Sequence, residues 1–228
     1  MAKNNSLFLQ LQGTFDEVVY VNSKTYGNHV RKPRGTYKPA PVNAVLQSNA
    51  NKAKTINAAA KRLHDLLNGV YKPFKKSNTW SNILSRMRSC GCTEFYDLLA
   101  SVKGLELHED YPLQRFHVLI VPQIKTAKKQ LTIAWKNGFV NSLRTEEFKM
   151  EWSVLFFGDR VEKDSCVIAE PKVIASSAAS VADDSCVIDI PKGVKYYVAC
   201  LKMVKGKGGR FEDYLKNTGA RVVEVGRV

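Results

Sequence analysis

A line of apolar residues at helical spacing runs through the first half of the chain and constrains the fold more than any other feature. Its members, of which only Asn49 is polar, are separated by four and three residues in turn: Val42, Leu46, Asn49, Ala53, Ile56, Ala60, Leu63, Leu67 and Val70. This spacing places them on one face of an α-helix. Pro41 precedes the line, Asn43 can cap its first turn, and Gly69 lies where a helix often ends. The pattern predicts a helix over residues 42–68.

This apolar helix face has two interpretations. Five residues of the line are the ones expected to make its packing or association contacts: Val42, Leu46, Ile56, Leu63 and Leu67. The first interpretation is packing against the helix's own domain. The second is self-association, because the small side chains of Ala53 and Ala60 would let a second helix approach closely. A seam of about four heptads with two alanines makes a weak isolated coiled coil, so packing within the domain is favoured.

Charge is distributed unevenly along the 228 residues. The chain has 35 Lys and Arg, 21 Asp and Glu, and a net charge of +14. Residues 1–90 hold 15 cations and 3 acids, a net of +12, whereas residues 91–228 hold 20 cations and 18 acids, a net of +2. Within residues 18–93 the only acidic residue is Asp65. Such a field attracts polyanions or an acidic protein surface.

Two segments concentrate the cations of the N-terminal part. Residues 29–39 combine cations with proline and glycine, which predicts an extended, exposed arm rather than a strand at a sheet centre. Residues 72–77 predict a basic loop. The residues expected to bind nucleic acid or another polyanion are Arg31, Lys32, Arg34, Lys38, Lys72, Lys75 and Lys76. Their charges would neutralise phosphates and release counterions, while nearby aromatic side chains could stack on unpaired bases.

The remaining patterns predict further helices and then strands. A second helix begins at Thr79 and ends near Gly91, with four apolar residues on one face: Trp80, Ile83, Leu84 and Met87. After about residue 113 the apolar period changes to two. The clearest strand, with one face expected to be buried, contains Phe148, Met150, Trp152, Val154 and Phe156. Asn137 and Gly138 predict a hairpin turn.

A nine-residue segment occurs twice in the C-terminal half. Residues 164–172 (DSCVIAEPK) recur as residues 184–192 (DSCVIDIPK), with seven of nine positions identical. Each copy predicts a strand ended by its proline. We expect the two strands to lie in the two halves of a β-sandwich, because many short strands separated by turns are typical of that architecture.

The predicted fold class is α+β. It consists of short N-terminal strands and a basic arm, two or three helices, and a C-terminal antiparallel β-sandwich of immunoglobulin-like size. Residues 1–110 would form the basic N-terminal part and residues 113–228 the β-sandwich domain.

Residues that commonly carry catalysis or hold metals are scattered along the chain. The five cysteines are an odd number, and Cys90 and Cys92 are one residue closer than the usual zinc-binding pair. The four histidines lack a paired metal-binding spacing, and residues 205–210 lack the Gly-Lys-Ser/Thr of a phosphate-binding loop. We therefore expect a chain that is not an enzyme, with no catalytic or metal site, no cofactor and no small-molecule substrate.

The distribution of apolar residues bears on whether the chain enters a membrane or is exported. The sequence has no stretch of about 18 apolar residues and no signal-peptide core. We expect a soluble protein with no membrane partner and with free thiols, located in the cytoplasm, or in a virion if it is phage-derived.

Three passages resemble other proteins. They are the turn and arm at residues 26–33, the helix rich in alanine and lysine at residues 47–67, and Ile190-Pro191-Lys192 with the strand that follows at residues 196–203. Together they resemble a loosely defined group of uncharacterised proteins of about two hundred residues from gut-type bacterial genomes and their phages or mobile elements. The resemblance implies a helical front and a β-sandwich back, and it brings no catalytic residues.

Two functions follow from these patterns. The first is a non-enzymatic structural or interaction protein, a subunit of a larger, phage-derived assembly, whose partner is an acidic protein surface or further copies of the chain in a homo-oligomer. The alternative is a sequence-nonspecific nucleic-acid-binding protein that uses the basic N-terminal part.

Overall fold

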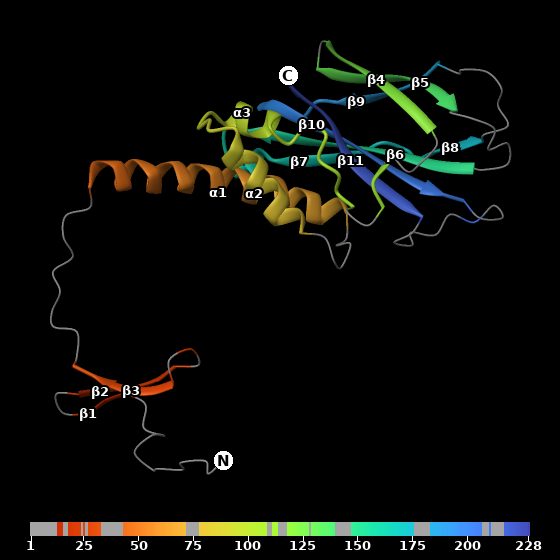
Figure 1. Cartoon of the computed structure of the whole chain (residues 1–228). Helices are drawn as coiled ribbons and strands as arrows, with labels where there is room; N and C mark the ends of the chain where they lie inside the picture. The colour runs from red at the N-terminus through yellow and green to blue at the C-terminus, as the bar shows by residue number, and fades with distance from the viewer. Residues whose placement is uncertain are drawn as a thin grey trace. The chain divides into compact units, whose positions relative to one another are not determined.

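The computed structural model describes residues 13–15, 18–23, 25, 27–32, 43–71, 78–108, 111–113, 118–127, 129–139, 147–175, 183–206, 210 and 217–228. The fold is α+β with antiparallel sheets (Figure 1). The chain divides into two compact units, Met1–Gln47 and Ser48–Val228, which are described separately. Within the described residues, no helix combines the length and the apolar character needed to cross a membrane.

The first unit contains a small antiparallel sheet. Its strand order is β1 (Gly13–Phe15), β2 (Val18–Ser23) and β3 (Gly27–Arg31). Residues 29–31, predicted as part of the extended arm, therefore form an edge strand that pairs with β2. The sequence allows this because the first proline of the arm is Pro33, so the backbone N–H groups of β3 are available for pairing.

In the described part of the chain, three helices precede the two sheets of the second unit: α1 (Ala44–Val70), α2 (Thr79–Ser89) and α3 (Phe95–Ala100). The side-chain oxygen of Asn43 accepts a hydrogen bond from the backbone N–H of Val45 at 2.9 Å, which caps α1 as the sequence predicts. Gly91, just after α2, adopts a φ of +68°, a conformation that a glycine reaches without strain.

Two sheets make up the rest of the second unit. The large sheet has the order β11 (Thr218–Arg227), β10 (Val194–Lys205), β6 (Glu147–Gly158) and β7 (Ser165–Ile168), and β8 (Lys172–Ala175) also pairs with β6. The small sheet has the order β4 (Val118–Ala127), β5 (Gln130–Phe139) and β9 (Asp183–Asp189). A short 3-10 helix, η3 (Val161–Lys163), connects β6 to β7.

The hairpin turn predicted at Asn137 and Gly138 is wrong. Both residues lie within β5, where they pair with β4. The chain turns instead around Lys129, with a φ of 76°, and Ala127 pairs with Gln130 across the turn. Asn-Gly signals a turn only where strand pairing ends, and the pairing of this long hairpin continues through both residues.

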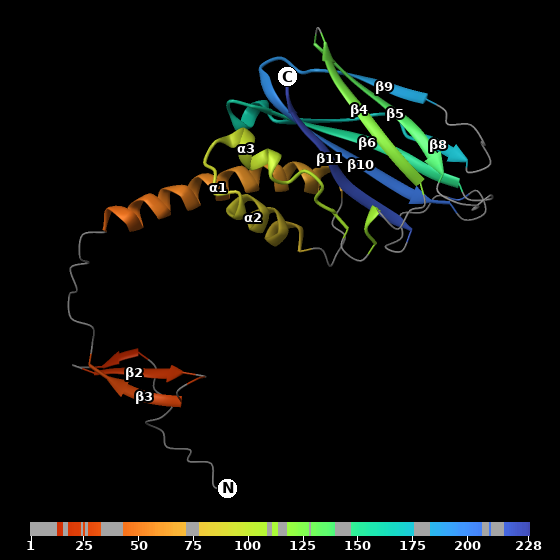
Figure 2. The same cartoon turned by 45° about the horizontal axis from the view of Figure 1, so that its top comes forward.

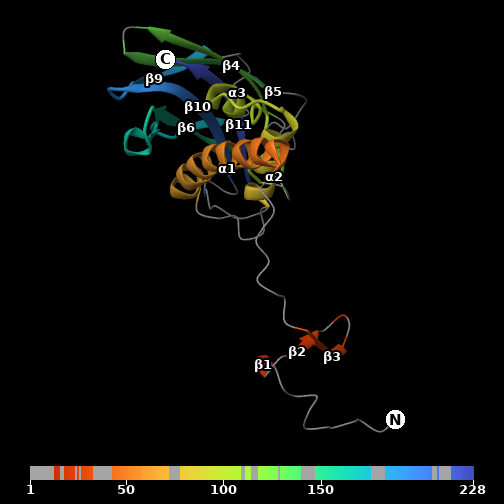
Figure 3. The ribbon, with the colours of Figure 1, turned by 90° about the vertical axis from the view of Figure 1, so that its left-hand side faces the viewer.

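The large sheet is covered on both faces. Figures 2 and 3 show α1 and α2 against one face and the strands β4, β5 and β9 over the other. Successive residues of β6 alternate between the two cores: Leu155 and Phe157 contact the helix side, whereas Val154 and Phe156 contact the small sheet. From Trp152 onward every residue of β6 is buried, so this strand has two buried faces where the sequence predicted one.

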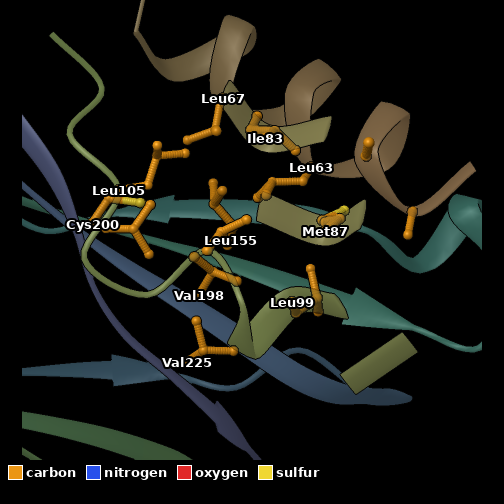
Figure 4. Packing of buried hydrophobic residues seen from close by; sticks show 14 of the residues in the cluster. Leu63, Leu67, Ile83, Met87, Leu99, Leu105, Leu155, Val198, Cys200 and Val225 are labelled. Atoms are coloured by element: carbon orange, nitrogen blue, oxygen red, sulfur yellow. The ribbon is translucent and has the colours of Figure 1, made fainter. Parts of the chain in front are cut away.

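The helix-side core joins the helices to the large sheet (Figure 4). Leu63 and Leu67 of α1 and Ile83 of α2 meet Leu155 and Val198 of the sheet. This shared core joins α1 from Ser48 onward, α2 and α3 to the strands of the second unit. The predicted parts, residues 1–110 and 113–228, stay a prediction.

The two copies of the repeated segment lie in different sheets. The first copy forms β7 in the large sheet, and the second forms β9 in the small sheet. The equivalent valines face in different ways: Val167 packs against the core between the sheets, whereas Val187 is 57% exposed. Similar strand sequences thus support opposite side-chain orientations, because the facing sheet, rather than the segment itself, determines which face is buried.

Two titratable groups lie deep in the helix-side core. Burial raises the pKa of the Cys200 thiol and of the Tyr71 hydroxyl well above their ordinary values. In the unfolded chain the thiol loses its proton near pH 8.5 and the phenol near pH 10. Above about pH 8.5 the unfolded state therefore binds fewer protons than the folded state, and the free energy of unfolding falls as pH rises.

Between about pH 9 and pH 11 the loss should be at least about 1 kcal/mol per pH unit, measured by urea denaturation at a series of pH values. The Cys200→Ala variant should show a slope shallower by about 1 kcal/mol per pH unit, because its unfolded state lacks one of the titrating groups. Equal slopes for the two proteins would contradict the assignment of the effect to Cys200.

Candidate polyanion-binding surface

Two of the seven cations predicted to bind a polyanion lie in the described part of the chain. Arg31 is the last residue of β3, where it pairs with Val19 of β2, and Lys32 follows it. Both side chains are exposed, and neither has an ion-pair partner among the described residues. The other five lie outside the described residues: Arg34, Lys38, Lys72, Lys75 and Lys76.

The first three turns of α1 are exposed on all sides. Every residue from position 44 to position 55 is exposed, including the apolar Val45 and Leu46 at 63% and 61%. The first buried residue of the helix is Ile56. We call residues 44–55 the free segment of α1. At 1.5 Å per residue it is about 18 Å long.

The start of burial at Ile56 follows from the residues on one line of the helix. Ile56, Leu63 and Leu67 lie on the side that faces the core. On this core-facing side, Lys52 lies one turn before Ile56, and Asn49 lies one turn before Lys52. Burying an unpaired ammonium or amide group costs free energy. This cost disfavours packing of the turns before Ile56 against a core.

The apolar line predicted from the sequence is therefore divided between two environments. Ile56, Leu63 and Leu67 are buried in the helix-side core, whereas Leu46 is exposed and Val42 lies outside the described residues. A strict seven-residue repeat drifts by about 20° per heptad around a straight helix. By Leu46 the line has moved away from the core-facing side of α1.

The cations of the helical layer fall into two groups. Three have acceptors within the protein: Arg62 pairs with Asp164, Arg86 donates to the carbonyl oxygen of Lys103 at 2.9 Å, and Lys103 pairs with Glu224 at 2.7 Å. Four others have no acceptor among the described residues: Lys52, Lys54, Lys61 and Arg88. The free segment thus carries cations whose charges no neighbouring carboxylate offsets.

Arg62 has a structural contact that the sequence did not reveal. Its Nε donates to Oδ2 of Asp164 at 2.7 Å, and its Nη2 donates to Oδ1 at 2.5 Å and to the carbonyl oxygen of Gly158 at 2.8 Å. The guanidinium also lies over the ring of Phe95, 4.4 Å from its centre. The Arg62 and Asp164 side chains are 15% and 5% exposed, so this pair ties α1 to the β6–β7 connection.

Two of the described histidines and the close cysteine pair have local partners. The ring of His64 meets Trp80 edge-on at 5.3 Å. The backbone N–H of Tyr111 donates to Nδ1 of the buried His108 at 3.1 Å, and the Cys92 thiol donates to the Cys90 carbonyl oxygen at 3.4 Å. The adjacent Cys90 side chain raises the pKa of Cys92, which opposes thiolate formation. Across the described ranges, no group of three or more His, Cys, Asp or Glu is placed to hold a metal ion.

No protein-family model matches the chain, and no curated protein matches it either. Function must therefore be inferred from the residues themselves. Exposed, unpaired ammonium and guanidinium groups along a segment without carboxylates can bind anions, and a row of such groups suits a polymer with repeated negative charge.

Proposed function

We propose that this chain is a non-enzymatic protein that binds nucleic acid without sequence preference through its N-terminal cations. One observation supports this most strongly. Residues 18–64 contain nine Lys and Arg and no Asp or Glu, and among the described cations of this stretch only Arg62 has a carboxylate partner. Unpaired surface cations are the groups that displace counterions from phosphates.

A phosphate polymer explains this surface better than an acidic protein does. Amide side chains accompany the lysines of α1, at Gln47, Asn49, Asn51 and Asn57. Amides and ammonium groups are common donors to phosphate and sugar oxygens of nucleic acids. Since the proposed contacts are to the backbone, they bring affinity without sequence preference.

In the proposed function, the C-terminal part carries the N-terminal cations rather than contacting nucleic acid itself. We propose that the large and small sheets form a β-sandwich of immunoglobulin-like size, which serves as the stable body of the protein. The working location would be the cytoplasm, or a virion if the chain is phage-derived, as its resemblance to phage and mobile-element proteins suggests.

The test is binding of the purified full-length protein to labelled single- and double-stranded DNA and RNA at about 50 mM and about 150 mM salt. We expect measurable binding that weakens steeply with salt. Changing Arg31→Ala together with Lys32→Ala should reduce the salt slope by about one for each phosphate that the variant no longer neutralises. The matched control, Lys125→Ala with Lys192→Ala, removes the same charge from exposed positions of the C-terminal part.

Three results of the binding measurements would count against this surface or against the proposed function. An unchanged slope in the Arg31 and Lys32 variant would remove these residues from the proposed surface. Equal losses in the variant and in its control would show a dependence on net charge alone. Absence of binding even at about 50 mM salt would overturn the proposed function.

The second candidate function is a structural subunit of a larger assembly built from copies of this chain. Exposed apolar side chains favour it: Val30 on β3 is 57% exposed, and Val45 and Leu46 on α1 are exposed to a similar degree. A homo-oligomer would bury them. The mass of the native protein in solution tests this candidate directly.

A further inference from the structure

We propose that the free segment of α1 (residues 44–55) enters the major groove of duplex DNA. This inference rests on the proposed nucleic-acid binding and specifies its ligand. The decisive property is exposure on all sides of the helix. The major groove is about 12 Å wide and a helix with its side chains is about 10–12 Å across, so only a helix with free flanks fits into it. The later turns of α1 pack against the large sheet, so only their outward side can reach the edge of the groove.

The side of α1 that faces away from the core carries suitable chemistry. Spacings of four, three, three and four residues place five exposed side chains on this side: Gln47, Asn51, Lys54, Asn57 and Lys61. The lysines can neutralise phosphates at the groove edges, and the amide nitrogens can donate to phosphate and sugar oxygens there, so the contact requires no sequence preference. The first carboxylate along this side is Asp65, beyond the free segment.

The composition of the free segment favours duplex DNA over other nucleic acids. Single strands are held largely by aromatic side chains that stack on bases, and residues 44–55 contain no aromatic residue. Duplex RNA has a deep, narrow major groove that side chains do not read. The wide groove of B-form DNA is the one that accepts a helix.

A second copy of the chain fits this helix less well. Lys52 lies on the same side of α1 as Ile56 and Leu63, so a second helix that continued the core along this side would cover Lys52 of both copies. Covering two like charges without acceptors is costly. Phosphates offer both lysines and amides a partner.

The rest of α1 would hold the inserted segment rigidly. The free segment continues without a break into turns anchored by Leu63, Leu67 and the Arg62–Asp164 pair. The first turn contains no acidic residue, so the positive end of the helix dipole faces an approaching phosphate unopposed. Both features support a contact that forms without a prior ordering step.

The experiment measures binding of the full chain to a fluorescein-labelled DNA duplex of about 20 base pairs by fluorescence anisotropy, at several salt concentrations. The variant is Lys54→Gln with Lys61→Gln, and the matched control is Lys125→Gln with Lys192→Gln. All four lysines are exposed, so both variants should remain folded, which circular dichroism verifies. Competition with methyl green, a major-groove ligand, and netropsin, a minor-groove ligand, locates the contact.

We expect the Lys54 and Lys61 variant to bind roughly ten-fold more weakly at about 150 mM salt, with a salt slope reduced by about two, while the control changes little. Methyl green should displace the protein and netropsin should not. Preference for single strands or duplex RNA, displacement by netropsin alone, or equal effects of variant and control would overturn the inference. Duplex binding that depends on Arg31 and Lys32 but not on Lys54 and Lys61 would preserve the proposed function while removing α1 from it.

Discussion

Replacing Arg62 with alanine should lower the free energy of unfolding by about 3–5 kcal/mol. The substitution leaves the carboxylate of Asp164, only 5% exposed, without its two charge-assisted hydrogen bonds. It also removes a donor from the carbonyl oxygen of Gly158 and a cation from the face of Phe95. Breaking one partner of a buried ion pair costs far more than the pair itself contributes, because the remaining charge stays buried.

Thermal unfolding followed by circular dichroism measures this effect. For a unit of this size the loss corresponds to a fall in Tm of roughly 10 °C. Lys61→Ala is the matched control, since Lys61 is the neighbouring residue on α1, is exposed and has no acceptor among the described residues. Its Tm should change by no more than about 2 °C. If the two variants unfold at the same temperature, the Arg62–Asp164 pair does not hold α1 to the β6–β7 connection.

An aspartate at Leu63 should be still more disruptive, with a loss of more than about 4 kcal/mol. Leu63 is fully buried between α1 and the large sheet (Figure 4). The substitution removes a large apolar side chain from that core and places an unpaired carboxylate there. We expect urea denaturation to show either a much earlier transition or a chain that no longer folds its second unit.

The same change at Leu46 is the control for this prediction. Leu46 belongs to the same predicted apolar line but is 61% exposed, near the beginning of α1. An aspartate in the first turn of a helix is favourable by about 0.3–1 kcal/mol, so Leu46→Asp should leave stability unchanged or slightly raise it. Equal destabilisation by the two substitutions would contradict the burial difference within α1. A smaller native mass for Leu46→Asp, in a protein that remains folded, would favour the assembly role.

Local patterns were sufficient for the elements whose stability depends on neighbouring residues. The apolar spacing predicted α1, and the position of Asn43 predicted its cap, because both signals lie within a few residues along the helix. The period of two through Phe148 and Trp152 likewise predicted β6. The cationic N-terminal part was also readable from sequence, since charge counts require no knowledge of contacts.

The sequence also indicates where the free segment of α1 ends. Lys52 and Asn49 occupy the core-facing side of the helix before Ile56, which a true helical period of 3.6 reveals and the seven-residue pattern does not. The free segment was therefore detectable in principle as a helical region with no continuous apolar face.

The sequence by itself determined the helices α1 and α2, the strand β6 with one buried face, and where the cations gather, because these properties depend on residues close together in the chain. Only the tertiary structure decided that the helices cover the second face of β6, that the repeated segments lie in different sheets, and that Arg62 meets Asp164 across 102 positions. Each of these depends on which surfaces meet when distant segments pack, and no local pattern records that choice.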